Sequence, residues 1–119
     1  MNATPVSWGT WALVGAAVLC NASAQLLMKR AGITDAFNWR AWVDPSLLAA
    51  VVLYGMSFVL TALVFARMPL SLISPLMAGA IFVLISVFSV VFLRESLDAT
   101  RIAGMVCILA GIVLLSRGV

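Results

Sequence analysis

The sequence predicts an all-α polytopic membrane protein, a single domain over residues 1–119 with four transmembrane helices. Three observations lead to this prediction. Hydrophobic residues make up 65% of the chain and charged residues only 9%, whereas about a quarter of the residues in a soluble domain are charged. The chain divides into four apolar stretches, each near the roughly 20 residues that cross a bilayer. The charged residues gather between these stretches, which cover about residues 8–28, 47–66, 70–93 and 99–116.

The first expected span ends at two basic residues, Lys29 and Arg30. The longest loop follows, and its large apolar side chains could lie flat on the membrane interface, as one short amphipathic turn would. These side chains belong to Phe37, Trp39, Trp42 and Val43.

Short turns separate the later spans. Arg67, Met68 and Pro69 form so short a connection that we expect the second and third spans to be antiparallel neighbours. Before the fourth span, the Asp98 side chain can cap the free backbone N–H groups of a helix that begins at Ala99 or Thr100.

The basic residues weakly predict the orientation of the chain in the membrane. With four spans, two of the seven basic residues lie on the side of the termini and five on the other. Because cytoplasmic loops are richer in Lys and Arg, the termini should face the exterior. The first group is Arg67 and Arg117, and the second is Lys29, Arg30, Arg40, Arg94 and Arg101.

The first span carries polar residues, although no expected span has Asp, Glu, Lys, Arg or His in its interior. Asn21, Gln25 and Lys29 follow one another at intervals of four, which places them along one helix face. An unpaired amide in hydrocarbon costs several kcal/mol, so these side chains should face protein or a polar cavity. One hypothesis is that the amides bond to a neighbouring helix and that Lys29 only reaches toward the interface. The other is a path for a polar headgroup that ends at a positive charge.

Further candidate substrate-binding residues lie in the second and third spans. The second carries Tyr54 and Ser57, and the third carries Ser74 and Pro75. Pro75 removes one backbone hydrogen bond, and the freed carbonyl is tolerated where a cavity, water or another helix satisfies it. A kink without a binding role is the alternative.

The fourth span offers a face of small residues. Gly104, Cys107 and Gly111 would let another helix backbone approach closely, so we expect a packing face there, in a dimer.

Several classes of function are disfavoured. The sequence shows no nucleophile with a base, no metal-ligand cluster and no Gly-rich phosphate loop, so we expect no enzyme, no catalytic residues, no cofactor and no metal. Cys20 and Cys107 lie within apolar stretches, and His is absent. The net charge of +3 reflects helix ends and membrane orientation better than nucleic-acid binding.

Nearly the whole chain resembles the small multidrug resistance family, in the wider drug/metabolite transporter superfamily that includes the EamA-type proteins. Tyr54, Ser57 and Pro69 match its second span and turn, and Lys29 matches the end of its first helix. The last loop and helix resemble it most, at Leu97, Asp98, Ile102, Gly104, Met105, Ile108, Ala110 and Gly111. The resemblance implies a dimer, since such proteins work in pairs, commonly antiparallel.

Departures from the family pattern shape the functional hypothesis. The family's exporters of cationic compounds carry a membrane-embedded glutamate where this chain has Asn21, and asparagine has neither a charge for a cation nor a proton to exchange. Gln25 with Lys29, Ser74 with Pro75, and the acidic Glu95 look like the branch that flips undecaprenyl-phosphate-linked sugars, including the aminoarabinose flippase subunits.

Three hypotheses follow. The first is a flippase that moves a polyprenyl phosphate, or its glycosylated form, across the bacterial inner membrane, with Lys29 or Arg30 meeting the phosphate. The second is efflux of small cations or metabolites. The third is a non-transporting subunit of a heterodimer. The expected partners are the lipid-linked substrate, membrane lipids, and a second copy or a paralogue.

Overall fold

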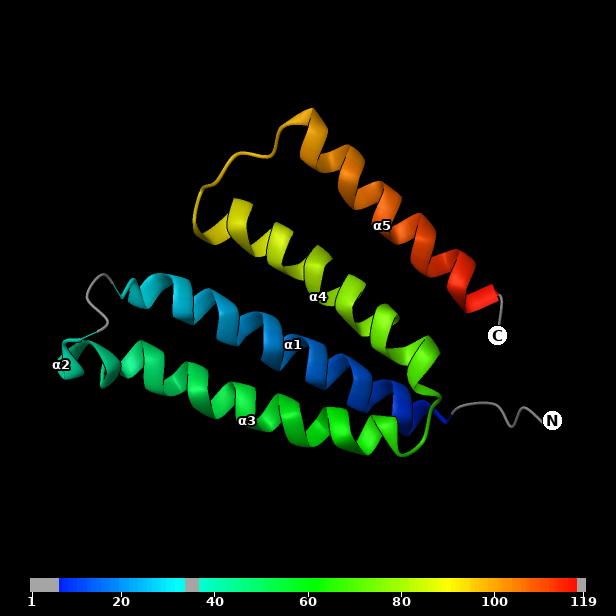
Figure 1. Ribbon diagram of the computed structural model, residues 1–119, viewed down its shortest axis with the longest axis horizontal. Helices are drawn as coiled ribbons and strands as arrows, with labels where there is room; N and C mark the ends of the chain where they lie inside the picture. Colours follow the sequence, from blue (N-terminus) through cyan, green and yellow to red (C-terminus); the bar gives the residue numbers. More distant parts are fainter. Residues whose placement is uncertain (1–6, 34–36, 118–119) are drawn as a thin grey trace.

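A computed structural model describes residues 7–33 and 37–117 and is all-helical (Figure 1). The predicted domain also includes residues 1–6, 34–36 and 118–119, which lie outside the described part. The described helices are α1 (Trp8–Ala31), α2 (Trp39–Trp42), α3 (Pro45–Phe65), α4 (Leu70–Phe92) and α5 (Ala99–Arg117).

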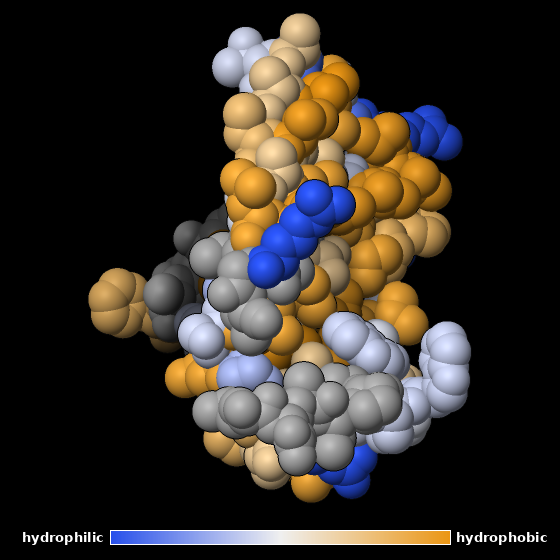
Figure 2. Space-filling view, turned by 90° about the vertical axis from the view of Figure 1, so that its right-hand side faces the viewer, coloured by the Kyte–Doolittle hydropathy of each residue, from blue (hydrophilic) through white to orange (hydrophobic). Residues whose placement is uncertain are grey.

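Helices α1, α3 and α4 are each long and apolar enough to cross a membrane. The apolar part of α5, Ala99–Leu114, is shorter, so the fourth crossing stays a prediction. Large apolar side chains reach the surface, as the face drawn in Figure 2 shows. Phe58 is 76% exposed and Leu114 is 70% exposed. Such a surface suits lipid rather than water, and the chain is a multi-pass membrane protein.

Local side-chain caps begin most of these helices. The Asp98 carboxylate accepts a hydrogen bond from the Arg101 backbone N–H at 2.8 Å, which confirms the predicted cap. Ser7 accepts from the Thr10 N–H at 3.3 Å. α1 ends at Gly32, whose φ of 57° is a left-handed conformation that glycine adopts without a steric penalty. These caps satisfy backbone groups that the ends of helices leave unpaired.

The helices lie in the order α3, α1, α4, α5 (Figure 1). α1 contacts both α3 and α4, and α5 packs mainly against α4 in the described part. The prediction that the second and third spans are neighbours was therefore wrong for most of their length. The short turn at residues 67–69 holds the ends of α3 and α4 together, but α1 occupies the space between the two helices beyond that end.

α1 and α3 meet along a line of small, buried side chains, which we call the α1–α3 seam. On each helix the residues of this line recur every seventh position, the spacing of a left-handed helix pair. The Ser57 hydroxyl donates to the Ala17 carbonyl at 3.0 Å and fixes the register. The seam consists of Thr10, Ala17 and Ala24 on α1 and Ala50, Ser57 and Val64 on α3.

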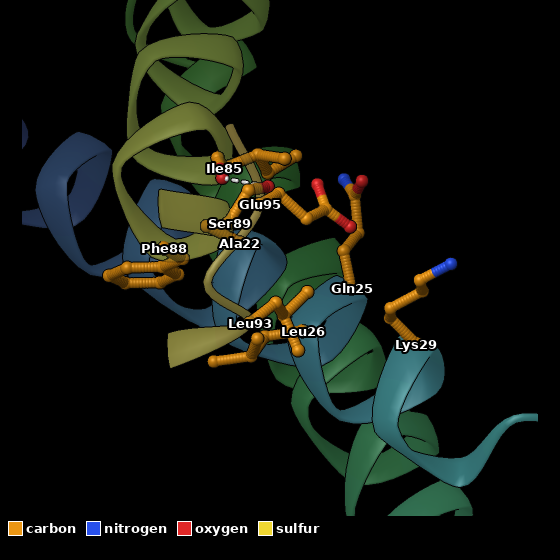
Figure 3. A pocket seen from close by; sticks show the side chains of 9 residues that line it. All are labelled: Ala22, Gln25, Leu26, Lys29, Ile85, Phe88, Ser89, Leu93 and Glu95. Atoms are coloured by element: carbon orange, nitrogen blue, oxygen red, sulfur yellow. Dashed lines mark hydrogen bonds between the residues drawn. The ribbon is translucent and has the colours of Figure 1, made fainter. Parts of the chain in front are cut away.

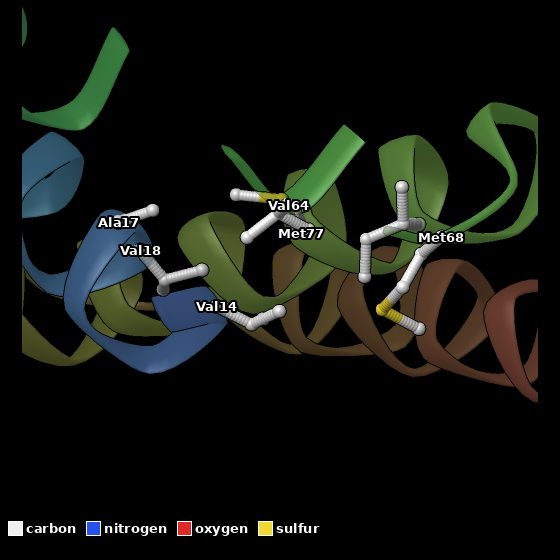
Figure 4. Packing of buried hydrophobic residues seen from close by; sticks show 7 residues of the cluster. Val14, Ala17, Val18, Val64, Met68 and Met77 are labelled. Carbon is white, nitrogen blue, oxygen red and sulfur yellow. The ribbon is translucent and has the colours of Figure 1, made fainter. Parts of the chain in front are cut away.

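A cluster of buried apolar side chains joins α1, α3 and α4 near the α3–α4 turn (Figure 4). It consists of Val14, Ala17, Val18, Val64, Met68, Ile73 and Met77. At α5 the contact is narrower. A Cβ added to Gly79 would overlap the Ile112 side chain, so Gly79 permits the close approach of α5 to α4.

Candidate functional site

The three residues predicted to line one face of α1 do so, but the amides pair with each other. The Gln25 Nε2 donates to the Asn21 Oδ1 at 2.7 Å. Both side chains are half-buried, and Lys29 is exposed one turn further on. Among the described residues, this bond along α1 takes the place of the expected hydrogen bond to a neighbouring helix.

A hollow between α1 and α3 contains part of the predicted site. We call it the Asn21 groove; its volume is about 480 Å³. Tyr54 is half-buried there, whereas the Ser57 hydroxyl is already engaged by the Ala17 carbonyl. The lining of the groove provides amide and hydroxyl groups beside an aromatic ring, and it contains no carboxylate. The lining residues are Asn21, Tyr54, Gly55, Ser57, Phe58 and Thr61.

A second hollow lies on the other side of α1, against α4 and the loop that follows it (Figure 3). We call it the Gln25 pocket, and its volume is about 310 Å³. Its polar side chains are Gln25, Lys29, Ser89 and Glu95, and its apolar wall includes Leu26, Phe88 and Leu93. The Asn21–Gln25 hydrogen bond runs along α1 where the two hollows adjoin.

An unusual turn brings Glu95 to the Gln25 pocket. Arg94 has a φ of 55°, a left-handed conformation that costs a non-glycine residue about 1–2 kcal/mol. Directly after it, the Glu95 backbone N–H donates to the Ser89 carbonyl at 3.0 Å, which folds the chain back over the last turn of α4. The sequence suggested only a family likeness for Glu95. The signal that could have found it was its charge, opposite to that of Lys29.

Other predicted site residues lie apart from both hollows. Ser74 is exposed and Pro75 half-buried in the first half of α4, which continues as a helix past the proline. The Arg30 guanidinium lies 6.0 Å from the centroid of the Phe92 ring. A substrate role for these three residues stays a prediction.

The predicted packing face of α5 is open within this chain. Gly104 and Cys107 are exposed and Gly111 is half-buried. A Cβ on either glycine would meet no atom within 4 Å, so the close approach that small residues permit is absent there. A dimer through this face stays a prediction. Among the described residues, no three His, Cys, Asp or Glu side chains are grouped as metal ligands.

Comparison with known proteins identifies the family. The profile of the Small Multidrug Resistance protein family matches residues 9–108. Multidrug resistance protein EbrA of Bacillus licheniformis is 35% identical over 101 residues, which cover 84% of this chain and 89% of EbrA. The uncharacterized protein y4nH of Sinorhizobium fredii is 29% identical over 126 aligned positions, 99% of each chain. The chain therefore belongs to the small multidrug resistance family and is a membrane transporter of that type.

Proposed function

We propose that the chain exports small amphipathic organic compounds across the bacterial inner membrane and binds them in the Asn21 groove. The likeness to EbrA, named a multidrug resistance protein, supports this second of the sequence hypotheses over the first. The observation that carries the proposal is the groove itself, in which an aromatic ring and hydrogen-bonding groups share one hollow of about 480 Å³. Pockets of 300–1,000 Å³ suit small organic ligands.

The chemistry of the groove bears on the substrate and on the driving force. Asn21 and Tyr54 can orient a ligand by hydrogen bonds, but neither supplies the negative charge of a carboxylate. Neutral compounds should therefore be accepted as well as cations. With no acid in the groove lining, movement down the compound's own gradient is the proposed mode of transport.

A partner subunit completes this proposal. The Asn21 groove lies along the exposed surface of α1 and α3, and Phe58 at its edge is 76% exposed. A second copy, or a paralogue, would cover the groove and separate the compound from lipid.

The test is release of an ammonium dye and of a neutral dye of similar size from proteoliposomes that contain the purified chain. We expect both dyes to leave faster than from protein-free liposomes, without a proton gradient, and Asn21→Ala and Tyr54→Leu to lose most of this release. Asn38→Ala is the matched control, because Asn38 only caps α2, by accepting from the Arg40 N–H at 3.1 Å. Wild-type release at the rate of empty liposomes, or full release by both groove variants, would overturn the assignment.

A lipid-linked headgroup is the second candidate substrate, as in the aminoarabinose flippase subunits of the EamA-type branch. It is favoured by one observation, the polar line from Asn21 through Gln25 to the exposed charges of Lys29 and Arg30. The matching test is flipping of a fluorescent polyprenyl phosphate in the same proteoliposomes. Flipping that Gln25→Ala abolishes, with no release of either dye, would replace the first candidate with this one.

A further inference from the structure

We infer that the Gln25 pocket is a separate binding site for a zwitterionic headgroup, with a primary ammonium held by Glu95 and a phosphate or carboxylate held by Lys29. The shared chemistry of the ligand is one positive and one negative group a few bonds apart. This site lies on the α4 side of α1 and the Asn21 groove on the α3 side, and the two adjoin at the Asn21–Gln25 hydrogen bond. The assignment does not rest on the transport activity proposed above.

The arrangement of charges carries the assignment. Lys29 from α1 and Glu95 from the α4–α5 loop line one pocket together with the Gln25 amide, and Figure 3 shows the Gln25 amide next to the Glu95 carboxylate. No ion pair joins either charge to another residue in the described part of the chain. Two opposite charges that do not meet leave room for a ligand that bridges them, and hydrogen bonds to charged groups are the stronger ones.

The backbone around Glu95 keeps this residue at the pocket. Arg94 is held in a left-handed conformation, and the Glu95 N–H is tied to the Ser89 carbonyl. A left-handed residue just after the last turn is a common way for a helix to end, so this geometry shows how the loop is held and not what it binds. The effect here is to fix the Glu95 backbone at the pocket instead of letting the loop turn away.

The apolar wall and the depth of the pocket favour an amphipathic ligand. Leu26, Phe88 and Leu93 line the same hollow and can contact a chain attached to the headgroup. The exposed tryptophans of α2 lie at the same end of the molecule (Figure 1), and such rings favour the headgroup region of a bilayer. We therefore expect the pocket at the depth of lipid headgroups.

The experiment measures the unfolding temperature of the purified chain in a neutral detergent as each of four probes is added. These are phosphatidylethanolamine, soluble phosphoethanolamine, phosphatidylglycerol, and a lipid with a cationic trimethylammonium headgroup. A ligand of the folded state raises the unfolding temperature with its concentration. We expect phosphatidylethanolamine to act at about tenfold lower concentration than either singly charged lipid.

The two zwitterions distinguish the sources of the ligand. Stabilisation by both identifies headgroup recognition that needs no acyl chain, and stabilisation by the lipid alone identifies a membrane lipid. Either result supports the site. If neither zwitterion stabilises the protein more than phosphatidylglycerol and the cationic lipid do, the inference is wrong.

Variants separate the site from a general effect of charge. Glu95→Gln should weaken the response to phosphatidylethanolamine about tenfold, to the level of phosphatidylglycerol, and Glu95→Asp should restore part of it. Lys29→Gln should lose the response in the same measure. Arg67→Gln removes an exposed cation at the other end of the molecule and should change nothing. An unchanged response of Glu95→Gln would overturn the inference.

Tyr54→Leu keeps the outcome independent of the proposed transport. Tyr54 lines the Asn21 groove and not the Gln25 pocket, so this variant should lose dye release and keep the full response to phosphatidylethanolamine. A loss of both would show that the two hollows form one site and would refute a separate one.

Discussion

Ser57→Ala tests whether the α1–α3 seam holds the protein together at this hydroxyl. Ser57 is only 3% exposed, and its hydroxyl lies 3.0 Å from the Ala17 carbonyl oxygen. Hydrogen bonds between membrane helices contribute about 0.6 kcal/mol on average and up to about 1.7 kcal/mol. Because this one is buried away from lipid and water, we expect the free energy of unfolding to fall by about 1 kcal/mol, which is about a fivefold change in the ratio of folded to unfolded protein.

The assay is equilibrium unfolding in lipid–detergent bicelles, followed by the accessibility of a label on each of two helices. Ser74→Ala is the matched control, because it removes the same hydroxyl from an exposed position and should change the free energy of unfolding by less than about 0.5 kcal/mol. Equal effects of the two substitutions would refute the structural role of the seam.

A second readout separates packing from substrate binding at Ser57. Since its hydroxyl is engaged by Ala17, Ser57→Ala should leave the apparent affinity for a released dye unchanged. If the dye affinity falls while the free energy of unfolding stays constant, Ser57 is a binding residue, as the sequence suggested, and the seam is held by other contacts.

Three further substitutions or probes test other parts of the fold. Gly79→Leu should detach α5 from α4, because even a Cβ at this position overlaps the Ile112 side chain. We expect faster proteolysis of the α4–α5 loop, with α1 and α3 still protected from the protease. An unchanged rate of cleavage in this loop would contradict the prediction. Arg94→Val should lower the free energy of unfolding by about 1 kcal/mol or more relative to Arg94→Gly, since a β-branched residue suits φ 55° least; equal stability of the two variants would mean that the turn is not left-handed. A variant whose only tryptophans are Trp39 and Trp42 should be quenched most by nitroxide at the headgroup and least by nitroxide deep in the acyl chain, and the reverse order would exclude an interfacial α2.

Much of the helical architecture could be predicted because its signals are local. Span length, the charges between the apolar stretches and the Asp98 cap each act within a few residues of where they occur. The lateral order of the helices is not local. The turn at Arg67 restricts where α4 begins but does not determine which helix lies beside α4. α1 lies between α3 and α4 because its alanines pack closely against α3, while its valines also contact α4.

In the candidate site, too, the residues that local sequence signals specify could be predicted, and those that depend on distant contacts could not. Asn21 and Gln25 were found because their spacing shows directly that they share a helix face. Glu95 was not recognised as a pocket residue, because its position depends on a left-handed Arg94, and arginine gives no sequence signal for that conformation. Ser57 was found as a polar residue, but its hydrogen-bond partner is a backbone carbonyl. Every residue has such a carbonyl, so the sequence does not indicate which one Ser57 contacts.

The central place of α1 bears on how the protein assembles as it is synthesised. Chains fold from their N-terminal parts while the rest is still being made. When α3 and then α4 reach the bilayer, the surface that each one packs against is already there, so neither has to wait for a later helix. α5 arrives last and packs mainly against α4 among the described helices. It is the part that should open first under a mild denaturant, ahead of the three-helix unit that it joins.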